Sequence, residues 1–157
     1  SLITTLLFYL YFKTLSPYEF MEMKDDLLLF LFVFVIASYY AIEKVKNYFK
    51  SKDPKEIVLD EVCGQLIPLI MIVVIIGSPE TLTKSSMQEY LLKFTMINKE
   101  LYILTSFISF RFFDIVKPFP VSYFDKKYKN SFGILFDDIV AGICAAVLIA
   151  IPLLIVT

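Results

Sequence analysis

The sequence contains no histidine and only two cysteines, Cys63 and Cys144, among its 157 residues. The absence of histidine excludes Ser–His–Asp hydrolases, phosphatases with a histidine nucleophile and the usual histidine-rich zinc sites. The two cysteines lie far apart in apolar stretches, so they predict neither a CxxC motif nor a disulfide framework. Any catalysis must therefore come from carboxylates, lysine, arginine, tyrosine or a bound metal.

Apolar side chains, by contrast, are present in excess. They make up 58% of the chain, whereas an ordinary soluble domain is about 45–50% apolar. A domain of this length cannot bury so much apolar surface, so we expect residues 1–157 to form one membrane-embedded domain. The chain has 15 basic and 16 acidic residues, and this balance argues against a nucleic-acid partner.

Five apolar stretches predict an all-α fold, a polytopic membrane bundle of about five helices. The stretches are Leu2–Phe12, Leu27–Ile42, Leu66–Ile76, Leu101–Phe113 and Ile134–Val156. Only the last reaches the ~20 residues of a membrane span on its own, so the others need their semi-polar flanks to cross a bilayer. The first stretch lacks a basic leader and a small-residue cleavage site, so we do not expect a cleavable signal peptide.

The distribution of basic residues predicts the orientation of such a bundle. The segments 43–61 and 111–133, which follow the second and fourth stretches, carry ten of the fifteen lysines and arginines. The positive-inside rule places these segments in the cytoplasm. The N-terminus is then expected on the cytoplasmic side and Thr157 on the opposite side. Most carboxylates of the third, fourth and fifth helices fall at their cytoplasmic ends, in three clusters.

The first cluster follows Asp53. The pattern Asp-Pro-x-Glu is typical of an N-cap, a proline at the first helical position and a glutamate at the third, and it predicts a helix from here to Gly77. Pro68 has no N–H, so we expect a kink that frees the carbonyl of Gly64 next to Asp60. The alternative is that the acidic pair at 60–61 consists of solvated interfacial charges.

The second cluster surrounds Arg111. This residue and Asp114 are three positions apart on a predicted helix, so they either pair with each other or serve a ligand. Arginine suits bidentate phosphate binding, and Lys117 can add a point charge. Pro118 and Pro120 end the helix and fix the direction of Lys117. Asp114 would orient Arg111 or reach a metal.

The third cluster is the pair Asp137 and Asp138, which opens a long apolar helix. A charge inside such a helix is expensive and usually functional. Asp138 shares a stripe with small residues, which lets membrane helices approach closely; these are Ala141, Gly142, Ala145 and Ala146. Carboxylate oxygens select hard cations such as Mg²⁺ or Mn²⁺. Together with an arginine and a lysine, they indicate metal-assisted hydrolysis of a phosphomonoester.

Three motifs, in order, resemble the phosphatidylglycerophosphatase A family. They are Asp60-Glu61-x-x-Gly64, the run Phe110–Pro120 and the run Gly133–Gly142, and the resemblance covers roughly residues 53 to 145. It implies a Mg²⁺-dependent lipid phosphatase of the bacterial inner membrane, with its active site on the cytoplasmic face. The implied substrate is phosphatidylglycerophosphate, which would be converted to phosphatidylglycerol. Family members usually open with a segment ending in Gly-Thr-x-Gly-Ser-Leu, of which Ser1-Leu2 would be the tail.

The site hypothesis assigns a role to each charged residue. The predicted metal ligands are Asp60, Glu61, Asp137 and Asp138, with Mg²⁺ or Mn²⁺ as the cation. Arg111 and Lys117 would bind the substrate phosphate. The predicted catalytic set is Asp60, Glu61, Arg111, Asp114, Lys117 and Asp138, in which Glu61 is a further ligand or the base that orients water. Either water attacks directly or an aspartyl-phosphate forms first.

Two readings from other classes stay open. A cation transporter or channel subunit would use the clustered carboxylates for conduction, but it predicts acids spread through the membrane depth. An interaction or scaffold protein is the other alternative, but it does not explain why carboxylates gather in these clusters. The sequence is compatible with a homo-oligomer.

Overall fold

The computed structural model describes residues 2–14, 19, 22–45, 58–77, 99–128 and 130–155. Within these residues the chain forms helices and no strand, which confirms the all-α prediction. The helices are α1 (Leu2–Thr14), α3 (Lys24–Val45), α4 (Leu59–Gly77), α6 (Lys99–Val116), α7 (Val121–Lys127) and α8 (Ser131–Ile155). The described residues of each of the five predicted apolar stretches therefore lie in a helix of their own.

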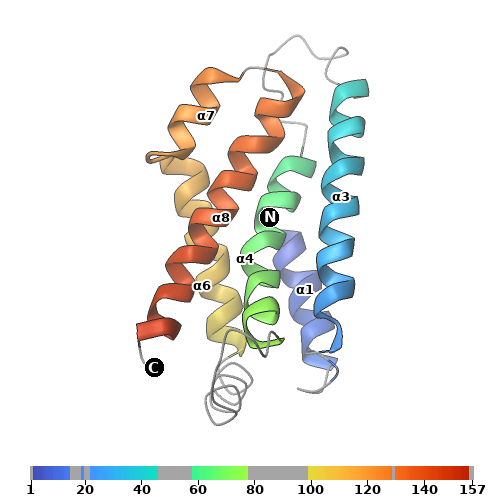
Figure 1. Cartoon of the computed structure of the whole chain (residues 1–157), viewed down its shortest axis with the longest axis vertical. Helices are drawn as coiled ribbons and strands as arrows, with labels where there is room; N and C mark the ends of the chain where they lie inside the picture. The colour runs from blue at the N-terminus through green and yellow to red at the C-terminus, as the bar shows by residue number, and fades with distance from the viewer. Residues whose placement is uncertain are drawn as a thin grey trace.

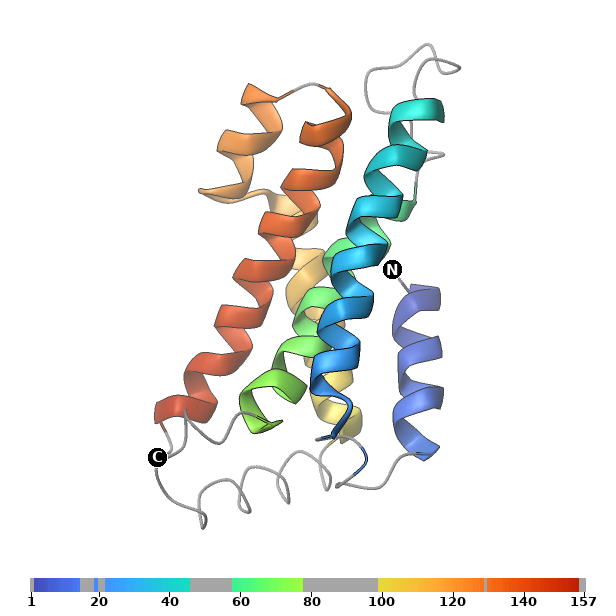
Figure 2. The ribbon, with the colours of Figure 1, turned by 45° about the vertical axis from the view of Figure 1, so that its right-hand side comes forward.

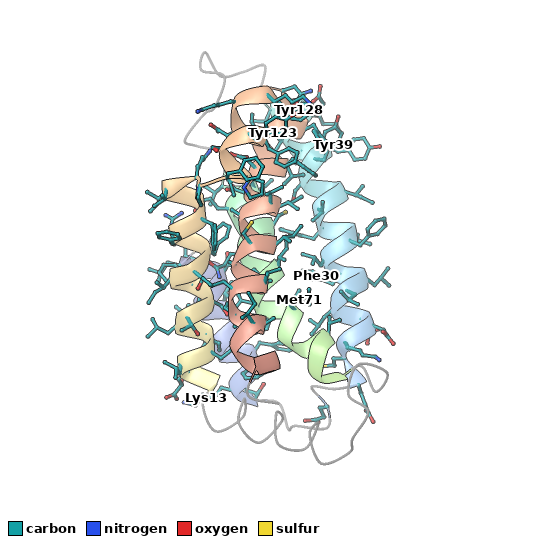
Figure 3. The ribbon with its side chains drawn as sticks, turned by 60° about the vertical axis from the view of Figure 1, so that its left-hand side comes forward. Lys13, Phe30, Tyr39, Met71, Tyr123 and Tyr128 are labelled. Carbon is teal, nitrogen blue, oxygen red and sulfur yellow. The ribbon has the colours of Figure 1, made fainter. Side chains whose placement is uncertain are left out.

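The five longer helices run along the long axis of the molecule, and the short α7 sits at one end beside the start of α8 (Figure 1). The helices α3 and α6 end there, and α4 and α8 begin there. We call this end of the bundle the α7 end. Figure 2 shows α1 at the opposite end, beside the lower half of α3. In Figure 3, Tyr39, Tyr123 and Tyr128 mark the α7 end and Lys13 marks the other.

The helix α4 is the centre of the bundle because it packs against α1, α3, α6 and α8. Its contact with α8 is the most extensive in the described structure. Small residues allow this approach, since Ala141 and Ala145 of α8 are fully buried and the carbonyl oxygen of Gly64 lies next to Gly142. The predicted small-residue stripe is therefore confirmed as a packing surface. Tyr102 of α6 donates its hydroxyl to the carbonyl of Pro68, which ties α6 to the middle of α4.

One helix boundary differs from the prediction, and one helix was not predicted. The predicted start at Asp53 lies outside the described residues, but Val58 is not helical and α4 begins at Leu59. The predicted helix is therefore not continuous through Val58, and its part before Val58 lies outside the described residues. The helix α4 extends as far as Gly77, the last described residue of this part of the chain. The second difference is α7, which lies in a segment predicted to be only a stiff exit from α6.

The N-terminus of α8 is capped by Asn130. Its side-chain Oδ1 accepts a hydrogen bond from the N–H of Gly133 at 2.9 Å. Its backbone oxygen accepts one from the N–H of Ile134 at 3.1 Å. Asparagine is among the preferred N-cap residues. The cap fixes where α8 starts, and with it the positions of the acidic pair one to two turns further along.

Among the helices that the structure describes, two are long and apolar enough to cross a membrane, by length and composition alone. They are Lys24–Val45 and Ser131–Ile151. The helix α3 leaves most of its apolar side chains on the outside of the bundle, among them Leu29, Phe32 and Val33. A helix of 13 residues such as α1 is only about 20 Å long, which is shorter than the ~30 Å hydrocarbon core. The five-span arrangement and its orientation remain predictions.

Candidate active site

Charged side chains from five parts of the chain meet at the α7 end. The start of α4, the end of α6, the α6–α7 link, α7 and the first turns of α8 all contribute. We call this group the charged cluster: Asp60, Glu61, Arg111, Asp114, Lys117, Asp125, Asp137 and Asp138. It contains every residue that the sequence predicts for the site. Residues as far apart in sequence as 60 and 138 are brought together because α4 and α8 both begin at this end.

Arg111 holds one half of the charged cluster together. Its Nη1 lies 2.7 Å from Oδ2 of Asp114, one helical turn further along α6, and 3.3 Å from Oε2 of Glu61 on α4. The predicted pairing of Arg111 with Asp114 is therefore observed. The second contact crosses from α6 to α4, so the guanidinium links two helices. Arg111 is about one-third exposed, which leaves part of its donor fork open to a ligand.

Lys117 forms the ion pairs in the other half of the charged cluster. Its Nζ lies 2.7 Å from Oδ1 of Asp125 and 2.6 Å from Oδ2 of Asp137. Burial lowers the pKa of Lys117, but the hydrogen bonds with these two carboxylates outweigh it and raise the pKa above its ordinary value. The ammonium therefore stays charged at neutral pH. A protonated lysine has three N–H donors, so the two carboxylates leave it one donor for a further ligand.

The backbone of Lys117 has a left-handed conformation, with φ of 44°. Its N–H donates to the carbonyl of Phe113 at 3.0 Å, as in the common helix ending in which glycine is the usual residue. A residue with a Cβ pays about 1–2 kcal/mol for this conformation. Strain of this kind collects at functional sites. A lysine here, in place of glycine, is consistent with a function for its side chain.

Three carboxylates of the charged cluster are buried, among them Asp137, which is paired with Lys117. Asp60, Asp137 and Asp138 are 8%, 7% and 5% exposed. Asp138 interacts electrostatically with both of the others, and also with Asp114 and Lys117. Asp60 accepts a hydrogen bond from the N–H of Glu61 at 2.9 Å through its Oδ1. The prediction that Asp138 faces the interior is confirmed.

The donor chemistry of the charged cluster suits a hard cation. Six carboxylates face only two basic side chains, and three of the carboxylates are buried. Oxygen-only donor sets of this kind bind Mg²⁺ or Mn²⁺. In the part of the chain that the structure describes, no three acidic or cysteine side chains have the arrangement of a metal site. The assignment of Asp60, Glu61, Asp137 and Asp138 as metal ligands therefore stays a prediction.

Some polar residues at or near the site were not predicted. Asp125 was given no role, because its helix was not predicted; the available signal was its position eight residues after Lys117. Gln65 of α4 and Ser106 of α6 are fully buried. Among the described residues, neither side chain has a hydrogen-bond partner for its buried polar atoms. The signal in the sequence was a polar side chain inside each apolar helix.

The fold and the charged cluster together define a helical protein with two basic side chains beside buried carboxylates at one end of its bundle. A family model described as Phosphatidylglycerophosphatase A matches residues 1–153. The chain belongs to this family. The match extends beyond residues 53 to 145, where the motifs indicated the resemblance.

Three relatives are similar to parts of this chain. A Phosphatidylglycerophosphatase A of Haemophilus influenzae is 54% identical over 48 residues, or 31% of this chain and 29% of the relative. The Escherichia coli protein of the same name is 40% identical over 45 residues, 29% of this chain and 26% of the relative. A Bacteroides thetaiotaomicron protein, provisionally named a phosphatidylinositol-3-phosphatase, is 29% identical over 119 residues, 76% of this chain and 60% of the relative.

The matched segments thus span between about a quarter and three-fifths of the relatives' lengths. No solved structure matches the chain.

Proposed function

We propose that this chain is a lipid phosphatase that hydrolyses the terminal phosphomonoester of phosphatidylglycerophosphate, giving phosphatidylglycerol and inorganic phosphate. One observation carries the proposal: two basic side chains suited to binding phosphate, those of Arg111 and Lys117, lie among buried carboxylates at one end of the bundle. The family membership and the names of two relatives support the same substrate.

A lipid substrate requires the charged cluster to lie at the surface of a bilayer. The length and apolar composition of α3 and α8 support a membrane location, and the charged cluster lies near the N-terminus of α8. We infer a multi-pass protein of the bacterial inner membrane, with the N-terminus and the α7 end on the cytoplasmic side, from the basic segments that follow α3 and α6. The substrate would then enter sideways from the inner leaflet, with its acyl chains remaining in lipid.

Mg²⁺, or Mn²⁺ in its place, is the cofactor that the donor set favours. Asp60, Asp137 and Asp138 would hold it, with Glu61 either as a further ligand or as the base that orients water, since hard cations prefer carboxylate oxygens. The excess of acidic over basic side chains in the charged cluster supports this assignment, because a divalent cation would offset it. When bound, such a cation polarises a phosphoryl oxygen and offsets the negative charge of the phosphate.

The remaining residues bind and orient the reactants. Arg111 offers a planar donor fork to two phosphate oxygens, and Lys117 offers a point charge to a third. Asp114 fixes the guanidinium of Arg111 through its 2.7 Å contact. Glu61, 3.3 Å from the same nitrogen, is placed to orient an attacking water and accept its proton. The new P–O bond forms from that water while the bond to the glycerol oxygen breaks; this oxygen takes up a proton from solvent, and Glu61 returns to solvent the proton that it accepted.

The comparisons do not support the transporter or channel alternative. A conduction pathway needs acidic residues along the membrane depth. The acidic residues of the charged cluster instead share one end of the bundle with Arg111 and Lys117. That mixture suits the binding of an anion together with a cation.

Phosphate release from defined lipids tests the proposal. Purified protein in detergent micelles would be given phosphatidylglycerophosphate, phosphatidic acid or phosphatidylinositol 3-phosphate, each with and without EDTA. We expect release from phosphatidylglycerophosphate to be fastest, to stop with EDTA and to return with added Mg²⁺. Faster release from phosphatidylinositol 3-phosphate would show that the substrate is this lipid, as the name of the Bacteroides relative indicates, and not phosphatidylglycerophosphate. No release from any of the three lipids would refute the proposed function.

A further inference from the structure

Asp125 shares the ammonium of Lys117 with Asp137. The two carboxylates lie 2.7 Å and 2.6 Å from the same Nζ and come from different helices, α7 and α8. Asp125 is the more exposed of the two, and Asp137 is nearly buried. The ammonium of Lys117 is therefore held from two sides. Asp125 contacts it at the edge of the charged cluster, and Asp137 contacts it from the interior.

The position of Asp125 is fixed by the packing of α7. Val121 at the start of α7 is fully buried. The ring of Phe124, the residue before Asp125, packs against Phe136 of α8 with centroids 5.0 Å apart. The same ring stacks on Tyr128 at 6.4 Å. These apolar contacts hold α7 against α8, so the carboxylate of Asp125 stands on an anchored helix.

Lys117 is anchored as well, through its backbone. It ends α6 in a left-handed conformation and its N–H is bonded to Phe113. A long side chain that starts from a fixed backbone still has several rotatable bonds. The two ion pairs are what restrict the ammonium to one place. Without Asp125, the described contacts leave Asp137 as its carboxylate partner.

We propose that Asp125 is a positioning residue, which holds the ammonium of Lys117 where it can bind the substrate phosphate while Asp137 serves the cation. The inference rests on the proposed function, in which Lys117 binds phosphate and Asp137 is a metal ligand. The ammonium of Lys117 stays paired with Asp125 when Asp137 binds the cation. Losing the carboxylate of Asp125 drives Lys117 onto Asp137, so that the phosphate loses a contact and the cation loses a ligand.

The test uses Asp125→Asn, which preserves the size of the side chain and removes its charge. Phosphate contacts made equally in the ground and transition states change KM rather than kcat. We therefore expect KM for phosphatidylglycerophosphate to rise about tenfold with kcat within about twofold, and the half-saturating Mg²⁺ concentration to rise. Asp125→Glu restores KM toward the wild-type value because it restores the carboxylate. Glu43→Gln, which removes one negative charge from an exposed residue near the end of α3, is the matched control.

A double-mutant cycle distinguishes positioning from a general structural role. In a Lys117→Met background, Asp125→Asn should cause no further rise in KM, because its effect passes through the missing lysine. Additive effects in this cycle, or an Asp125→Asn protein with wild-type KM and Mg²⁺ dependence, would overturn the inference while leaving the proposed function intact. So would an Asp125→Glu protein that shows no recovery. A wild-type protein that releases no phosphate overturns the proposed function, and this inference with it.

Discussion

Replacing Gly64 by alanine should push α4 away from α8 at the level of the charged cluster. A Cβ at this position would lie 2.5 Å from the backbone oxygen of Asp138 and 2.5 Å from Cε2 of Phe110. The ring of Phe110 can turn aside at some cost, but the oxygen of Asp138 is part of the α8 backbone. Relief must therefore come from a movement of one helix relative to the other.

The size of this movement follows from the contact distance. Ordinary van der Waals contact begins at 3.4 Å, so the two backbones must separate by about 0.9 Å in a close-packed interface. Overpacking of this kind costs about 1–3 kcal/mol of stability. Asp60 lies one turn before Gly64, so the same shift changes its distance to Asp138. A displacement of about 1 Å in a catalytic constellation can reduce the rate about 100-fold.

The assay compares Gly64→Ala with Ala37→Ser, which adds one atom to an exposed residue of α3. Phosphate release from phosphatidylglycerophosphate and the unfolding temperature in detergent would be measured for both. We expect Gly64→Ala to lose most of its rate at temperatures where it is still folded, while Ala37→Ser matches the wild type. A Gly64→Ala protein with wild-type rate and stability would show that the helices do not approach as closely as described.

Three further predictions concern the residues that build the site. Asn130→Ala removes the cap of α8 and should lower the free energy of unfolding by about 1 kcal/mol, whereas Asn130→Asp should retain most of it; equal losses in thermal unfolding would refute the cap. Lys117→Gly should be more stable than Lys117→Ala by about 1 kcal/mol, because glycine adopts the left-handed φ without strain, although both have a raised KM for phosphatidylglycerophosphate; the reverse order of stability would contradict that conformation. Asp114→Asn leaves Arg111 with Glu61 as its one acidic contact of the two described, and its kcat/KM should fall about tenfold, which an unchanged value would refute.

The long helices could be predicted from the sequence because each is an apolar stretch that needs burial or lipid. The boundaries were less secure. The signals around Asp53 describe a cap, but a cap pattern is local and does not decide whether the chain continues as helix past Val58. The helix α7 was missed because Pro118 and Pro120 indicate the end of one helix. Pro120 is also the N-cap residue of the next helix, a position at which the missing N–H of proline removes no hydrogen bond within the helix.

The charged cluster was predictable in its members and less so in its contacts. The pairing of Arg111 with Asp114 follows from helical spacing alone, because residues three apart share a face. The contact between Arg111 and Glu61 depends on how α6 packs against α4, which spacing does not specify. The contact of Lys117 with Asp125 depends on a helix that was not predicted. Residue types and motifs therefore indicated the site, and tertiary packing determined which partners meet.

The most direct test of the account is the effect of Asp138→Asn on phosphate release. This substitution keeps the shape of the most deeply buried carboxylate of the charged cluster and removes its charge. Asp26→Asn, in the first turn of α3 at the opposite end of the bundle, is the control. With Mg²⁺ present, we predict that Asp138→Asn releases phosphate from phosphatidylglycerophosphate at least about 100-fold more slowly than the wild type, and that Asp26→Asn keeps the wild-type rate. A wild-type rate for Asp138→Asn would contradict the central claim that the charged cluster is the catalytic site.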